Sequence, residues 1–98
     1  MQIDYCYTKY YNDGTKRVEK CSTKCNKDIF VECILENVKR LFVLDFWALP
    51  ALMTISYDQI IMSVDNIEIV ISTNEPNFNF EDYQSALRKM FEKIRYGV

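Results

Sequence analysis

The chain has 98 residues, of which 49% are hydrophobic and 27% charged, and its net charge is −2. This length allows one domain on a single core, and the hydrophobic content excludes an intrinsically disordered chain. It contains no long uninterrupted apolar run and does not open on a basic segment followed by an apolar one, so neither a membrane span nor a secretory signal is predicted. We therefore expect one folded domain over residues 1–98, inside a cell and without a membrane partner.

The first third of the chain predicts a β-hairpin. Two strand-like runs, 2–11 and 16–25, flank the turn residues Asn12, Asp13, Gly14 and Thr15. A four-residue loop sets Cys6 opposite Cys21 and predicts a disulfide between them, whereas a three-residue loop with a bulge at Gly14 gives a different register. In the four-residue register neither face is apolar. Residues 2–24 either join the sheet of a compact body, residues 26–98, or protrude from it as an arm, and the missing apolar face favours protrusion.

The next segment predicts a helix capped by Asn26 or Asp28. Apolar side chains recur at helical spacing, at Phe30, Val31, Ile34, Leu35, Val38, Leu41 and Phe42. The pattern then becomes apolar on every side, through Phe46 and Trp47, until Pro50 ends it. Such a segment is either buried centrally or covered by another subunit.

After Pro50 the spacing of hydrophobic residues changes to every second position, as in a β-strand. Runs 52–56, 59–64 and 67–72 predict a three-stranded antiparallel meander with Val64, Met62 and Ile60 facing Ile67, Ile69 and Ile71. On the opposite face, Ile61 and Val70 form a small apolar patch. Asn79 caps a last helix, whose apolar positions are Phe80, Tyr83, Leu87, Met90, Phe91 and Ile94.

The predicted fold is therefore α+β. A protruding N-terminal hairpin is followed by a helix, a three-stranded antiparallel meander and a C-terminal helix in a two-layer domain.

The residue types argue against catalysis. The chain has no histidine, which removes the commonest general base and metal ligand, and it has no glycine-rich phosphate loop. The four cysteines lack the paired spacing of zinc sites. Asp45, beside Phe46 and Trp47, is the one carboxylate whose surroundings suit an elevated pKa, but a helix-end acid is the commoner interpretation. We expect a protein that is not an enzyme and that has no cofactor and no metal.

Charge is distributed unevenly. In residues 1–27 six basic and three acidic groups give +3, while residues 28–98 carry −5. Aromatic and apolar side chains are the candidate contacts for a protein partner: Tyr5, Tyr7, Tyr10, Tyr11, Val18, Phe46, Trp47, Ile61 and Val70. Basic side chains beside those tyrosines are the alternative contacts, for nucleic acid: Lys9, Lys16, Arg17 and Lys20. A basic, marginal ribbon and an acidic body also favour a homodimer that exchanges the hairpin.

The cysteine-bearing hairpin, with Tyr5-Cys6-Tyr7, Asn12-Asp13-Gly14 and Lys20-Cys21 on a compact body, resembles in character the small accessory proteins of filamentous archaeal viruses. Phage anti-CRISPR inhibitors are similar in style. The resemblance implies a viral or mobile-element protein in the host cytoplasm, or associated with the virion, that acts by binding a host protein or a host defence complex. It assigns no role to any single residue.

Overall fold

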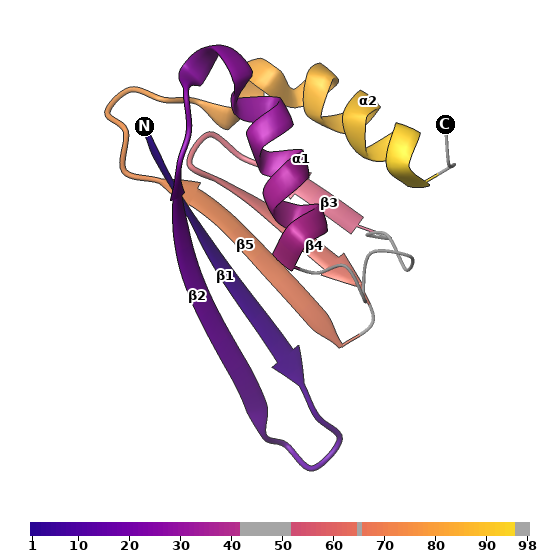
Figure 1. The fold of residues 1–98 in the computed structure, drawn as a ribbon. Coiled ribbons are helices and arrows are strands. Elements are labelled where there is room, and N and C mark those ends of the chain that lie inside the picture. Colours follow the sequence, from indigo (N-terminus) through magenta and orange to yellow (C-terminus); the bar gives the residue numbers. More distant parts are fainter. Residues whose placement is uncertain (42–51, 65, 96–98) are drawn as a thin grey trace.

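The computed structural model describes residues 1–41, 52–64 and 66–95, which form two helices on one face of a five-stranded antiparallel sheet (Figure 1). The strand order is β2-β1-β5-β4-β3. The strands are β1 (Gln2–Tyr10), β2 (Lys16–Lys24), β3 (Leu52–Ile55), β4 (Gln59–Val64) and β5 (Ile67–Thr73). Short 3-10 turns, η1 (Lys27–Ile29) and η3 (Phe80–Tyr83), lead into α1 (Phe30–Leu41) and α2 (Gln84–Arg95). The α+β class is confirmed, but the sheet has five strands instead of three.

The N-terminal hairpin belongs to this sheet. β1 lies between β2 and β5 and pairs with β5 from Ile3 to Lys9. The prediction of a protruding arm is therefore wrong, and so is the statement that the hairpin has no core face. Ile3, Tyr5 and Tyr7 of β1 are buried under the helices. Only β1 of the hairpin needs an apolar face to join the core, because β1 lies inside the sheet, between β2 and β5.

The hairpin loop also differs from the four-residue prediction. Gly14 has φ +86° and its N–H donates to the Tyr11 carbonyl at 3.1 Å, as in a three-residue loop with a glycine bulge. This loop moves the register by one residue, so that Cys6 faces Lys20 and Cys21 faces Tyr5. Cys6 and Cys21 then project from opposite faces of the sheet. The predicted Cys6–Cys21 disulfide is wrong, and all four cysteines are thiols.

The meander register is confirmed. Ile60 lies opposite Ile71, and Met62 opposite Ile69, in the β4–β5 pair, while β3 adds to the other side of β4. These four side chains face the helices and are buried. This register was predictable because the runs 59–64 and 67–72 have matched alternation; Asp65, in the turn predicted between them, lies outside the described residues.

The 3-10 turns that lead into both helices begin at residues that the sequence predicts as caps. The side chain of Asn26 accepts a hydrogen bond from the Asp28 amide at 3.0 Å, and that of Asn79 accepts one from the Glu81 amide at 2.9 Å. These contacts satisfy amides that have no partner inside the first turn.

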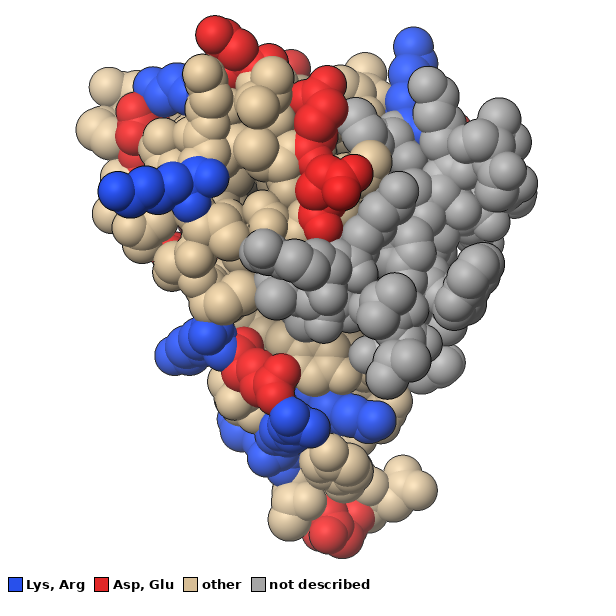
Figure 2. Space-filling view, in the orientation of Figure 1, with Lys and Arg blue, Asp and Glu red and all other residues tan. Residues whose placement is uncertain are grey.

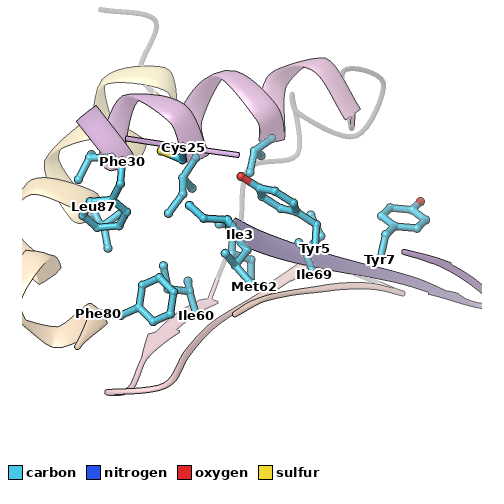
Figure 3. Close-up of a cluster of buried hydrophobic side chains, with 14 residues drawn as sticks. Ile3, Tyr5, Tyr7, Cys25, Phe30, Ile60, Met62, Ile69, Phe80 and Leu87 are labelled. Carbon is cyan, nitrogen blue, oxygen red and sulfur yellow. The ribbon is translucent and has the colours of Figure 1, made fainter. Parts of the chain in front are cut away.

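An aromatic cluster joins the helices to the sheet. The Phe30 ring meets Phe78 and Tyr83 edge-on, with ring centroids 5.1 and 4.2 Å apart, and Phe78 meets Phe80 in the same way. Figure 3 shows Phe30 and Leu87 reaching down from the helical layer, toward Ile60 and Phe80. The core is thus one continuous layer between helices and sheet.

Candidate functional site

The outer edge of β2 has no strand beside it among the described residues. The Met1 ammonium donates to the Cys25 carbonyl, the Cys25 N–H donates to the Met1 carbonyl, and the Tyr11 N–H donates to the Thr15 carbonyl. Antiparallel hydrogen bonding alternates along a strand, so odd-numbered residues of β2 bond to β1. The N–H and C=O groups of the even-numbered residues therefore point outward, and no described residue pairs with them.

This edge is long, exposed and basic. β2 has nine residues, of which only Cys21 and Thr23 are half-buried. Its even positions place Lys16, Lys20 and Lys24 on the sheet face away from the helices, with the exposed Val18 between the first two. On the other face Arg17 forms an ion pair with Glu19. In Figure 2 the basic side chains gather over the hairpin and acidic ones over the helical layer.

A groove runs beside the last residues of β2. It measures about 390 Å³ and is lined by Thr23, Lys24, Ile29, Glu32, Cys33, Glu36 and Asn37. Ile29 gives the groove an apolar contact surface, since its side chain lines the groove and is half exposed. Glu32 and Glu36 on α1 follow Ile29 at helical spacing and make the same wall of the groove acidic, while Thr23 and Lys24 of β2 line the other side.

Hydrogen bonds fix the position of α1 against β2. The Asn37 amide nitrogen donates to the Tyr5 hydroxyl at 3.2 Å and to the Thr23 hydroxyl at 3.1 Å. Burial raises the pKa of Tyr5, and the hydrogen bonds from Thr23 and Asn37 oppose that rise. This network links α1 to β1 and β2 beside the groove.

Of the two cysteines in this region, Cys33 lines the groove and Cys25 belongs to the core. The buried Cys25 thiol donates to the Asn26 carbonyl at 3.4 Å. Desolvation, followed by the contact with Cys33, raises the pKa of Cys25 to about 12. At neutral pH Cys25 is therefore a protonated, unreactive thiol.

The tyrosines that the sequence suggests for partner contact separate into two groups. Tyr5 and Tyr7 are 1% and 8% exposed and belong to the core, so they do not form a docking face. Tyr10, Tyr11 and Val18 are exposed near the hairpin loop. The Tyr11 ring lies 5.9 Å from the Lys9 ammonium.

Ile61 and Val70 lie side by side, as predicted, on the sheet face away from the helices. Both are half-buried, and Cys6 extends their row toward Lys20 on β2. The remaining apolar candidates, Phe46 and Trp47, lie outside the described residues, as does Asp45.

The candidate nucleic-acid contacts do not share one face. Lys16 and Lys20 project away from the helices, whereas Lys9 and Arg17, which lie opposite each other, project to the helical side. Alternation along β2 places Arg17 on the face opposite to Lys16 and Lys20 in any register, and the observed pairing of Lys9 with Arg17 places Lys9 on the Arg17 face.

Sequence reasoning missed the groove. Ile29 departs from the spacing of the buried α1 positions, and an exposed isoleucine just before a helix was the available signal. The edge position of β2 carried no such signal, because strand order depends on pairing between distant segments.

Comparison of the chain with protein-family models, with curated proteins and with solved structures finds no match. Within the described residues, no helix is long and apolar enough to cross a membrane.

Proposed function

We propose that the protein acts by binding another protein, without a catalytic step, and that the edge of β2 is the binding element. The observation that carries this proposal is the row of outward backbone groups on an exposed nine-residue edge strand. Such a row is a template on which an extended segment of a partner adds as a sixth strand. The resemblance in character to small viral accessory proteins agrees with an activity based on binding.

Hydrogen–deuterium exchange of individual amides tests the proposal. In the protein alone we expect fast exchange at Val18, Lys20 and Ser22, and slow exchange at the neighbouring amides that bond to β1. Ten-residue peptides that alternate valine with glutamate, lysine or threonine serve as probes. At least one of them should slow exchange at the outward amides, because the added strand accepts hydrogen bonds from them.

Val18→Pro should abolish this protection, since proline removes one outward donor and leaves the bonds to β1 intact. Val18→Thr, which keeps the N–H, is the matched control and should behave like the unmodified protein. If no peptide of the panel protects the outward amides, the proposed function is wrong.

Nucleic-acid binding is the second candidate, favoured by the exposed Tyr10 near Lys16 and Lys20 on one face of the hairpin. If those lysines contact phosphates, removing each one should lower the salt dependence of binding by about one counterion. Filter binding with single-stranded DNA at several salt concentrations measures this slope.

Self-association by hairpin exchange is a further possibility. Two chains would form the β1–β5 pairs between them that one chain here forms within itself. Light scattering at tens of micromolar measures the oligomeric state.

A further inference from the structure

We infer that the partner segment at β2 is an extended strand with acidic side chains at alternate positions and uncharged aliphatic side chains between them. This inference rests on the proposed function and adds to it the chemistry of the partner.

The positions of the outward backbone groups determine how an added strand is oriented. A partner residue that exchanges hydrogen bonds with Val18 or Lys20 projects its side chain to the same face as they do, away from the helices. The partner residues between them project toward α1. Each face of the added strand therefore meets a different surface of this protein.

On the face away from the helices, the partner meets lysines. Lys16, Lys20 and Lys24 are four residues apart and all exposed, and they lie on the strand that the partner joins. Opposite charges directly across a strand pair are stabilising and like charges are destabilising. Acidic residues at alternate partner positions therefore pair favourably with this row of lysines.

On the helical face, the partner meets the groove. Its side chains there lie beside Thr23 and against Ile29, Glu32 and Glu36. The two glutamates repel an acidic side chain, while Ile29 offers an apolar contact. Acidic residues are therefore disfavoured at these positions and aliphatic ones are favoured.

A second copy of the chain fits this edge less well. Pairing β2 with the β2 of another molecule brings two rows of three lysines onto one face of the shared sheet, in any register. A nucleic acid also fits less well, because phosphate oxygens only accept hydrogen bonds and leave the outward carbonyls of β2 without donors.

The alternating peptides test the partner's chemistry by titration, with amide exchange as the readout. We expect the glutamate–valine peptide to bind about tenfold more tightly than the lysine–valine peptide, and the difference to shrink at high salt. Lys20→Glu should weaken binding of the glutamate–valine peptide about fivefold and strengthen that of the lysine–valine peptide. Lys89→Glu, the same charge change at an exposed position of α2, is the matched control and should alter neither.

Two results overturn the inference and leave the proposed function standing. The first is equal protection by the threonine–valine and glutamate–valine peptides, and the second is tighter binding of the lysine–valine peptide. A ten-residue thymidine oligonucleotide that displaces the acidic peptide, and whose own binding leaves the outward amides unprotected, would instead favour nucleic acid. Absence of protection by every peptide contradicts both the inference and the proposed function.

Discussion

Gly14 decides which residues of β2 face the helices. Its φ of +86° lies in the left-handed region, where a residue without a Cβ has no steric penalty. The carboxylate of Asp13 supports the same loop by accepting hydrogen bonds from the amide and hydroxyl of Thr15, at 2.9 and 2.5 Å. These bonds lower the pKa of Asp13. Together the two residues place lysines on one face of β2, and Cys21 and Thr23 on the other.

The Cys25 thiol makes the free energy of unfolding depend on pH in the alkaline range. Its thiol has an ordinary pKa of 9.0 in an unfolded chain and a pKa of about 12 in the fold, so it keeps its proton longer when folded. Its contribution to stability is therefore fully present below pH 9.0 and is lost as the pH rises toward about 12. We expect the free energy of unfolding to fall in that range by at most about 1.4 kcal/mol per pH unit.

Denaturant titrations at several pH values measure this slope. Cys25→Ala is the control, because it removes the thiol to which the pH dependence is assigned. An identical pH dependence in the variant and the unmodified protein would contradict the assignment to Cys25.

At the scale of elements, the hairpin register determines which side chains of the edge strand β2 point away from the helices, and so where its lysines lie. Val18, Lys20 and Ser22 belong to the non-hydrogen-bonded pairs with β1, in which the two Cα atoms are closest. Cys6 lies opposite Lys20 in one of these narrow pairs. That separation suits a disulfide, whereas Cys6 and Cys21 point to opposite faces.

A designed crosslink tests this register. With Lys20→Cys and Cys21→Ser together, mild oxidation should join Cys6 to the new thiol at position 20. The unmodified chain should form no Cys6–Cys21 bond under the same conditions. Peptide mapping by mass spectrometry without reduction distinguishes these two disulfides. A Cys6–Cys21 bond in the unmodified chain would contradict the observed register and support the four-residue loop.

At the scale of the whole molecule, β1 holds the sheet together. It is the strand between the hairpin partner and the meander, and it supplies Ile3, Tyr5 and Tyr7 to the single core. The Met1 ammonium and the Thr73 hydroxyl add hydrogen bonds at its start, to the carbonyls of Cys25 and Gln2 at 2.7 and 2.6 Å.

Residues 26–98 alone should therefore not fold. Loss of large buried side chains costs about 2–5 kcal/mol each, so three such losses cost about 6–15 kcal/mol, comparable with the total of about 5–15 kcal/mol typical of a small domain. Circular dichroism during heating should show no cooperative transition for the fragment, in contrast to the full chain. A cooperative melt of the fragment would mean that the hairpin is an independent arm after all.

The sequence by itself determined the local features of this protein. Asn26 and Asn79 act as caps because a short polar side chain satisfies a nearby amide. The matched alternation of the runs 59–64 and 67–72 predicts the pairing of β4 with β5. The exposed Tyr10, Tyr11 and Val18 were also within reach of sequence reasoning.

Only the tertiary structure decided the rest. The position of β2 at an edge follows from the pairing of β1 with β5, two strands separated by more than fifty residues, and no local pattern encodes a contact of that range. The burial of Tyr5 and Tyr7 follows from the same pairing. The lysine row and the groove beside it are consequences of a one-residue register and of where α1 packs, because side-chain direction in a strand reverses with every residue.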